Sequence, residues 1–291
     1  MLSQPTLDAL AVAGLDPAYV EDVALRTLEE DLDGGVDVTS VATVPFDLEG
    51  TAAFVPREDG VVAGIAVAMA CLDVAADDDL LYQHVSTDGP AKAGDQVLVV
   101  RGLVRTLLTA ERSALNLLCH LSGVATLTAR WVDAVAGTGA RIRDTRKTTP
   151  MLRAMEKAAV VVGGGVNHRL SLSDAALVKD NHVVAAGGVA AAYEAVRREF
   201  PHLQVQVECD TVAQVQEVVE AGATLLLLDN MGLADLRAAV AVCRPRGVLT
   251  EASGGLSLDQ ARAVAETGVD FLSVGALTHS APVLDLGMDL I

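Results

Sequence analysis

The chain has 291 residues, is 51% hydrophobic but only 3% aromatic, and carries a formal net charge of −18. This length suits one large α/β barrel or two ordinary domains, with a core of Val, Leu and Ala, as in buried parallel strands covered by helices. The acidic excess argues against nucleic acid as a partner, because the chain lacks the surplus cations that displace phosphate counterions.

Neither export nor a membrane anchor is expected from the sequence. The N-terminal segment, residues 1–10, has no cationic region, and the longest apolar run, residues 60–72, is shorter than the roughly 20 residues that span a bilayer. The four cysteines form no C-x-x-C pair and have no histidine at zinc-ligand spacing, which indicates buried free thiols. We therefore expect a cytoplasmic protein in a reducing compartment.

The first hundred residues have the pattern of a separate α+β unit. Residues 18–32 are predicted to form a helix, and three apolar segments between turn sequences are predicted to be strands: 51–57, 80–87 and 96–102. A long helical stretch follows from about Leu103, with a break near Ser122 and Gly123. We predict an N-terminal α+β domain over residues 1–110, to which a C-terminal tail, residues 278–291, returns.

From about residue 140 onward, a short apolar run, a polar cluster and a helical segment repeat. Six of these runs are predicted to be strands: 141–146, 175–180, 205–210, 224–230, 247–253 and 270–276. Because strands alternate with helices, the sheet should be parallel. A β/α barrel is favoured over an open doubly wound sheet, since no G-x-G-x-x-G motif follows the first strand. The predicted catalytic domain is therefore a β/α barrel over residues 111–277.

The residues that close these strands are the candidates for the active site, which in a β/α barrel lies at the carboxyl ends of the strands. The segment 141–182 has four acids and eight cations: Arg141, Arg143, Arg146, Lys147, Arg153, Lys157, Arg169 and Lys179. Arginine side chains match the oxygens of carboxylates and phosphates, so a ligand with several negative groups is expected. Arg141, Arg143 and Arg153 are more readily interpreted as surface or salt-bridge residues, and a single histidine such as His168 is more often structural.

The later strands end in different residues. Glu208 and Asp229 follow the middle strands, and two acids would repel phosphates unless a divalent ion or sugar hydroxyls lay between them. The last strands are followed by small residues, whose backbone amides could hold a phosphate: Ser253, Gly254, Gly255, Gly275 and Ala276. The pattern predicts a site for a phosphorylated substrate and Mg²⁺.

Six segments occur in a characteristic order and spacing: RDTRKTTPMLRAMEKAAV, GGGVNHRLSLSDAALVKDNH, VECD, LLLDN, EASGGL and TGVDFLSVGALTHS. In these segments the chain resembles quinolinate phosphoribosyltransferase, also called nicotinate-nucleotide pyrophosphorylase (carboxylating). The segments EEDLDGGVDVTS and TAERSALNLLCHLSGVAT extend the resemblance to nearly the whole chain. The specificity of these long motifs is high, because GGGxNHR followed by KDNH is not a generic barrel signature.

The resemblance implies a type II phosphoribosyltransferase of de novo NAD biosynthesis. Such an enzyme converts quinolinate and phosphoribosyl pyrophosphate, with Mg²⁺, into nicotinate mononucleotide, pyrophosphate and carbon dioxide. It also implies an N-terminal α+β domain, an incomplete β/α barrel of about six parallel strands, and a homodimer with shared active sites, which some members assemble further into a hexamer.

Residue by residue, the resemblance implies roles for the candidates. Arg112 would bind substrate in the active site of the neighbouring subunit. The other substrate-binding residues would be Thr145, Arg146, Lys147, His168, Arg169, Lys179, Ser253, Gly254, Gly255, Gly275 and Ala276. Catalysis falls to Lys147, Lys179, Glu208 and Asp229, of which Glu208 and Asp229 also hold the metal. The last five substrate-binding residues would hold the 5′-phosphate.

Two alternatives have other functions. A nicotinate phosphoribosyltransferase would handle one carboxylate, whereas the number of cations favours two. A non-catalytic relative associated with molybdenum transport would not need Glu208, Asp229 and the full set of cations, all of which are present.

Overall fold

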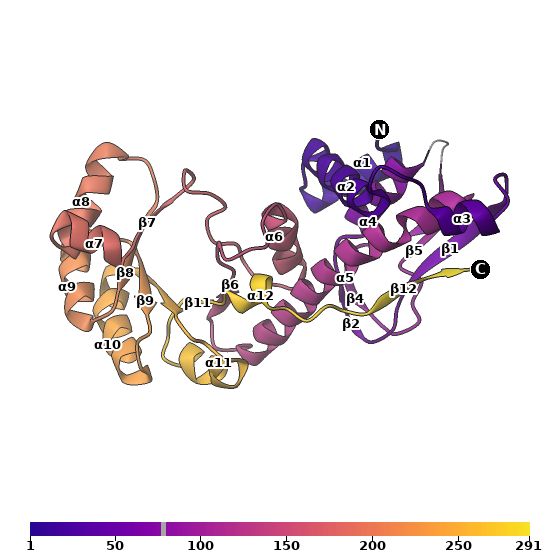
Figure 1. Cartoon of the computed structure of the whole chain (residues 1–291). Helices are drawn as coiled ribbons and strands as arrows, with labels where there is room; N and C mark the ends of the chain where they lie inside the picture. Colours follow the sequence, from indigo (N-terminus) through magenta and orange to yellow (C-terminus); the bar gives the residue numbers. More distant parts are fainter. Residues whose placement is uncertain (77–79) are drawn as a thin grey trace. The chain divides into compact units, whose positions relative to one another are not determined.

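The structure is a computed structural model that describes residues 1–76 and 80–291 (Figure 1). The chain forms two compact units. The first comprises residues 1–127, 149–163 and 280–291, and the second comprises residues 128–148 and 164–279. These units divide the chain differently from the predicted domains, residues 1–110 and 111–277, and the domain division stays a prediction.

The first unit contains two antiparallel sheets, one with strand order β12-β1-β5-β3 and one formed by β2 and β4. The strands are β1 (Glu49–Pro56), β2 (Gly60–Val62), β3 (Leu81–Val85), β4 (Gly89–Ala91), β5 (Leu98–Leu103) and β12 (Leu286–Leu290). Strands β1, β3 and β5 confirm the three strands predicted in this part of the chain. β12, from the C-terminal tail, pairs with β1.

The helices of the first unit include α1 (Gln4–Ala13), α2 (Pro17–Leu32), α3 (Val38–Thr43), α4 (Ile65–Ala75) and α6 (Arg153–Val162). α2 confirms the helix predicted over residues 18–32, and the side chain of Asp16 caps it by accepting a hydrogen bond from the Ala18 amide. α4 explains the longest apolar run, because its residues 65–73 are all buried and it packs against α1 and α2. Among the described residues, no helix is both long and apolar enough to cross a membrane.

The long helix α5 (Val104–Ala134) is continuous, so the predicted break near Ser122 and Gly123 is wrong. Both residues serve close packing instead. The Ser122 hydroxyl accepts a hydrogen bond from the Ala63 amide at 3.1 Å, and a Cβ atom on Gly123 would collide with the carbonyl of Pro282. A glycine is tolerated inside this helix because a neighbouring segment approaches its backbone closely.

The second unit is built on one six-stranded parallel sheet with strand order β6-β11-β10-β9-β8-β7. Its strands are β6 (Arg141–Arg143), β7 (Ala176–Val178), β8 (Val205–Cys209), β9 (Leu225–Asp229), β10 (Leu249–Ser253) and β11 (Phe271–Ser273), which confirm all six predicted strands. β6, the first strand in the sequence, pairs with β11, the last one. The two edge strands of the sheet are β6 and β7. This is the strand order of a β/α barrel that is open between its first and second strands.

Helices follow the strands of this sheet: α7 (Asp180–Ala186), α8 (Val189–Glu199), α9 (Val212–Glu220), α10 (Leu233–Cys243), the 3₁₀ turn η1 (Arg244–Arg246), α11 (Leu258–Ala265) and α12 (Ala276–His279). Figure 1 shows α8, α9 and α10 lying along the strands. α9 illustrates the local signals. Thr211 and Gln214 form a capping box at its start, and Val215, Val218 and Val219 are its buried stripe.

The two faces of the parallel sheet differ in chemistry because successive side chains point to opposite faces. One face carries buried apolar side chains such as Val207, Leu226 and Leu272. The other face carries polar side chains on several strands: Arg143 on β6, Gln206 and Glu208 on β8, Glu251 and Ser253 on β10, and Ser273 on β11. The strand register places Glu208 and Glu251 at the same level, on either side of Leu227. The polar face therefore holds the candidate site.

Candidate active site

A cavity of about 550 Å³ lies at the carboxyl ends of the parallel strands. Most of the predicted site residues line it: Thr145, Arg146, Lys147, His168, Arg169, Lys179, Glu208, Asp229, Ser253, Gly254 and Gly255. Leu177, Leu227, Asn230, Glu251 and Ser273 complete the lining. All of these residues belong to the second unit. Side chains from separate strands, far apart in the sequence, thus meet in one hollow.

Arg146 and Arg169 give this cavity its positive character. The Nε–H groups of both are buried, and neither has a hydrogen-bond partner in the described part of the chain. Burial lowers the pKa of the Arg169 guanidinium, and the positive charge of Arg146 lowers it further, against a smaller opposing effect of Asp174. Two neighbouring cations with unused buried donors are the arrangement that an anionic ligand would satisfy.

Lys147 lines the same cavity from the loop that follows β6. Its amide donates to the Thr145 hydroxyl at 3.0 Å, and its carbonyl accepts from the Thr278 hydroxyl at 2.7 Å, so the backbone is held on both sides. A Cβ atom on Gly275 would lie only 3.1 Å from Cδ of Lys147. Gly275 and Ala276 are therefore beside the Lys147 side chain, although they are not among the residues that line the cavity.

The acidic residues lie on the neighbouring strands. Lys179 Nζ is 3.3 Å from Glu208 Oε2, which links the cationic and acidic parts of the lining. Asp229 accepts a hydrogen bond of 2.6 Å from the side chain of Asn230. Within residues 1–76 and 80–291, no group of three or more His, Cys, Asp or Glu side chains gathers as a potential metal site. Of the three acids that line this cavity, Glu251 is already bonded to Arg143, Gln206 and Ser273, so Glu208 and Asp229 remain as the candidate metal ligands.

The turn after β10 requires its glycines. Gly254 and Gly255 have φ angles of +91° and +57°, in the left-handed region. A Cβ atom on Gly254 would also collide with the side chain of Asn230, and the main-chain N–H of Asn230 donates to the Ser253 carbonyl at 2.9 Å. The turn therefore presents main chain rather than side chain to the cavity, as a phosphate-binding turn does.

A buried polar network lies below the cavity and includes residues that the sequence analysis missed. Glu251 is fully buried and accepts hydrogen bonds from Arg143 at 2.7 Å, Gln206 at 2.9 Å and Ser273 at 2.6 Å. The signal for Gln206 and Glu251 was present, since each lies two residues before a predicted site residue on a strand and thus shares its face. Polar residues at such positions of an apolar strand indicate a lined interior.

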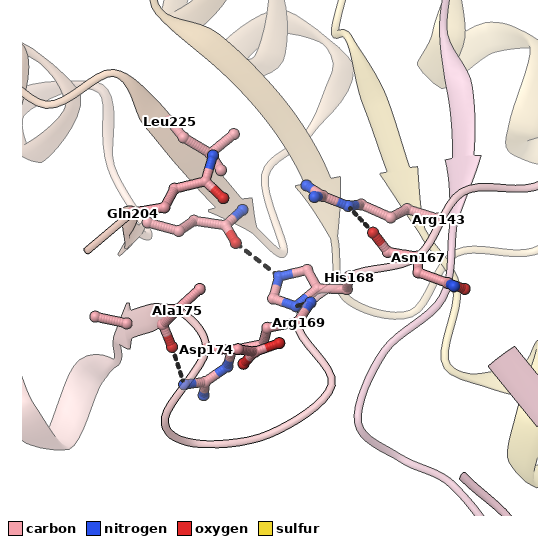
Figure 2. A pocket seen from close by; sticks show the side chains of 10 residues that line it. Arg143, Asn167, His168, Arg169, Asp174, Ala175, Gln204 and Leu225 are labelled. Atoms are coloured by element: carbon pink, nitrogen blue, oxygen red, sulfur yellow. Dashed lines mark hydrogen bonds between the residues drawn. The ribbon is translucent and has the colours of Figure 1, made fainter. Parts of the chain in front are cut away.

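His168 belongs to this network as well as to the cavity lining. Its Nε2 is 2.6 Å from Gln206 Oε1, and its Nδ1 accepts the Arg169 main-chain N–H at 2.8 Å. A second cavity of about 220 Å³ adjoins it (Figure 2). Figure 2 shows the Arg169 guanidinium directed to the Ala175 carbonyl, at 2.9 Å, and Arg143 directed to the Asn167 carbonyl. Both ring nitrogens of His168 are thus engaged within the protein.

The remaining candidates lie elsewhere. Arg143 forms the salt bridge with Glu251 and, together with Arg141, lies over the ring of Phe271, with guanidinium carbons 4.7 and 4.9 Å from the ring centroid. This agrees with the interpretation of both as structural cations. Arg112 is exposed on α5 in the first unit and is not among the residues that line the cavity.

Comparison with protein families matches nearly the whole chain. Residues 37–122 match the N-terminal domain of quinolinate phosphoribosyl transferase, and residues 124–289 match its C-terminal domain. The nicotinate-nucleotide pyrophosphorylase [carboxylating] of Mycobacterium leprae is 51% identical over 273 residues, which cover 92% of this chain and 96% of that protein. A probable nicotinate-nucleotide pyrophosphorylase [carboxylating] of Synechocystis is 41% identical and covers 83% of each chain.

Solved structures agree with these matches. NadC from Streptococcus pyogenes has a TM-score of 0.89 and 37% identity, covering 95% of this chain and 99% of that one. The nicotinate-nucleotide pyrophosphorylase from Francisella tularensis has a TM-score of 0.90 and 33% identity, covering 95% and 98%. Human nicotinic acid phosphoribosyltransferase, at 15% identity and a TM-score of 0.62, shares the fold alone. The chain belongs to the quinolinate phosphoribosyltransferase family.

Proposed function

We propose that the protein transfers the phosphoribosyl group of phosphoribosyl pyrophosphate to quinolinate with loss of carbon dioxide. The products are nicotinate mononucleotide and pyrophosphate, so the reaction belongs to NAD biosynthesis. Family membership over nearly the whole chain supports this activity. The observation that carries the proposal is a pair of buried Nε–H groups, those of Arg146 and Arg169, which have no hydrogen-bond partner among the described residues and lie in a cavity that Glu208 and Asp229 also line.

Arg146 and Arg169 would bind the two carboxylates of quinolinate. A buried guanidinium donor without a partner is costly, and a carboxylate repays that cost with a charge-assisted hydrogen bond. Lys147 and Lys179 extend the positive surface of the same cavity toward the pyrophosphate. Lys179 also contacts Glu208, so its ammonium group is held at the boundary between the anionic ligand and the acids.

Glu208 and Asp229 would face the ribose. Transfer at C1′ passes through a state with oxocarbenium character, as glycosyl transfers do, and carboxylates placed near the sugar stabilise that positive charge. They can also accept hydrogen bonds from the ribose hydroxyls. The Asn230 amide, bonded to Asp229, keeps that carboxylate oriented.

Mg²⁺ fits the same two acids. Mg²⁺ is commonly bound by one or two carboxylates when the substrate's phosphates supply its other ligands, and Glu208 and Asp229 line the same cavity. Bound there, the ion would neutralise charge on the departing pyrophosphate. Glu208 and Asp229 would hold it, and the main chain of the Ser253–Gly255 turn would hold the 5′-phosphate beside them.

The reaction needs no nucleophile from the protein. The ring nitrogen of quinolinate attacks C1′, the bond from C1′ to the pyrophosphate oxygen breaks, and the protein's task is to hold the two substrates in line. The resulting pyridinium accepts the electron pair left when the adjacent carboxylate departs as carbon dioxide, and a proton then replaces the carboxylate on the ring. Cations that grip the other carboxylate keep the ring in place during this step.

We also propose a cytoplasmic homodimer with shared active sites. Arg112 is exposed on α5. By its resemblance to the family, it matches the arginine that one subunit contributes to the active site of its neighbour. In a dimer of this kind Arg112 of one protomer would complete the cavity of the other. A hexamer would be an assembly of such dimers.

A direct assay tests the proposal. Purified protein is mixed with quinolinate, phosphoribosyl pyrophosphate and Mg²⁺, and nicotinate mononucleotide is followed by absorbance while carbon dioxide is trapped from carboxyl-labelled quinolinate. Equimolar release of both products is expected. Turnover of nicotinate in place of quinolinate, without carbon dioxide, would favour the single-carboxylate alternative. Calorimetric binding of quinolinate without any turnover would favour the non-catalytic one.

A further inference from the structure

Gln206, on β8, connects two polar groups below the cavity. The residue is buried, with 3% of its surface exposed. Its Oε1 is 2.6 Å from His168 Nε2, and its Nε2 donates to Glu251 Oε2 at 2.9 Å. A carboxylate can only accept hydrogen bonds, so the amide NH₂ faces Glu251 and the amide oxygen faces His168. The direction of the Gln206 amide is therefore set by Glu251.

Glu251 is itself fixed in position. Arg143 donates to its Oε2 at 2.7 Å, and the Ser273 hydroxyl donates to its Oε1 at 2.6 Å. The carboxylate has no exposed surface. With its charge matched by Arg143 and both oxygens bonded, Glu251 cannot rotate without losing several contacts. It provides a rigid reference for Gln206.

The direction of Gln206 decides the tautomer of His168. Facing an amide oxygen, the ring Nε2 must carry the proton. The other ring nitrogen, Nδ1, then has a free lone pair, and it accepts the main-chain N–H of Arg169 at 2.8 Å. The main-chain N–H of His168 is held in turn by the buried Asp144, at 2.7 Å from Oδ1. The opposite tautomer would place two N–H groups against each other at Arg169.

We propose that Gln206 is a positioning residue for Arg169. By holding His168 in the Nε2–H tautomer, Gln206 lets Nδ1 fix the main chain from which the Arg169 side chain starts. The far end of that side chain is held by the Ala175 carbonyl, at 2.9 Å from Nη1 (Figure 2). Its buried Nε–H, which has no partner among the described residues, is left for a ligand carboxylate. The inference rests on the proposed function, because quinolinate is the ligand assumed.

The tautomer is measured directly in the wild-type protein. The chain has six histidines, so a sample with ¹⁵N-labelled histidine is compared with a His168→Asn sample to assign the ring signals. A pyrrole-like signal for Nε2 and a pyridine-like signal for Nδ1 are expected for His168. The reverse pattern, or a ring protonated on both nitrogens, would overturn the proposal whatever the enzyme's substrate is.

Gln206→Met tests the consequence for binding. Methionine has a similar size but offers His168 Nε2 no comparable acceptor, so the KM for quinolinate should rise about tenfold or more, from the loss of a buried hydrogen bond. The KM for phosphoribosyl pyrophosphate should change by less than about twofold. The His168 signals should shift to a mixture of tautomers. A folded Gln206→Met protein with unchanged KM for quinolinate and unchanged ring signals would refute the role.

Gln204→Met is the matched control. Gln204 lies two residues earlier on the same face, lines the second cavity with Gln206, and is exposed. Its substitution should leave both KM values within about twofold of wild type. If the wild-type protein does not convert quinolinate at all, the proposed function fails, and the ring signals of His168 still decide whether Gln206 sets its tautomer.

Discussion

Arg143 donates a 2.7 Å hydrogen bond from Nη1 to Oε2 of the fully buried Glu251. Because of this pair, Arg143 and Arg146 have different roles although they are close in the sequence. Arg143 neutralises an acid inside the sheet, whereas Arg146, three residues later, has a buried Nε–H without a partner in the described part of the chain. Because Glu251 is already matched, it does not draw the cavity cations away from a ligand.

Arg169→Ala should lower kcat/KM for quinolinate by about 30-fold or more, because a buried carboxylate would lose a charged partner worth about 2 kcal/mol or more. Steady-state kinetics with quinolinate as the varied substrate measure this change. Arg237→Ala removes an exposed arginine on α10 and should leave the kinetics unchanged. Near-normal kcat/KM in a folded Arg169→Ala protein would remove Arg169 from the site.

Gly254→Ala should raise the KM for phosphoribosyl pyrophosphate and lower the stability. A side chain at φ +91° costs about 1–2 kcal/mol in strain, and the added Cβ also pushes against Asn230. Gly247→Ala is the control, since Gly247 has φ +66° but open space around its Cβ position. Thermal unfolding should show a loss in both variants, whereas only Gly254→Ala should change the KM. An equal KM in the two variants would argue against the turn as the phosphate site.

Removal of divalent metal should abolish the activity, and Mg²⁺ should restore it. Asp229→Asn should raise the Mg²⁺ concentration needed for half-maximal rate by about tenfold or more, because one of two carboxylates loses its charge. Asp235→Asn, on the exposed surface of α10, should have no such effect. Full activity in a chelator would contradict the metal proposal, and an unchanged Mg²⁺ requirement in Asp229→Asn would remove this residue from it.

Arg112→Ala and Lys179→Ala should each be inactive alone and regain partial activity when mixed under conditions that exchange subunits. A mixed dimer has one cavity with both residues intact if Arg112 completes the partner's site. Activity is measured after exchange has been verified with subunits of distinguishable mass. Verified exchange without recovery would argue against a shared site.

The thiols of Cys71, Cys209 and Cys243 should resist alkylation in the folded protein at pH 8. Burial raises the pKa of Cys71 and Cys209 to about 12 and that of Cys243 to about 11, from an ordinary value of 9.0. Iodoacetamide labelling followed by mass spectrometry should detect them only after unfolding. Fast labelling of the native protein would show that these side chains are accessible.

The same pKa shifts predict a loss of stability at alkaline pH. Above about pH 9 the unfolded chain loses thiol protons that the folded chain retains, so the free energy of unfolding falls as the pH rises toward 11 to 12. Below pH 9 these groups contribute no slope, because both states keep the protons. Urea denaturation at pH 8 and pH 10 measures the difference, and replacement of Cys71 by Ala should reduce it.

Most strands of the chain could be predicted because their signals are local. Short apolar runs bounded by polar clusters identified all six strands of the parallel sheet, and the alternation with helices identified their direction. The continuity of helix α5 could not be predicted from local signals. Ser122 and Gly123 have the local pattern of a break, but their contacts with Ala63 and Pro282, about 60 and 160 residues away in sequence, keep the helix continuous.

For the candidate site too, some features could be predicted from the sequence and others could not. The residue types at the strand ends, such as Lys179, Glu208 and Asp229, could be read from the sequence, because a β/α barrel brings the carboxyl ends of its strands together. The partners of those residues could not. Gln206 and Glu251 each lie two residues before a predicted site residue and share its face, but their hydrogen bonds join residues of different strands, and those pairings are not visible in the sequence. Composition, strand pattern and family motifs are properties of the linear chain, whereas which cation is neutralised and which remains for a ligand depends on distances that exist only after the strands pack.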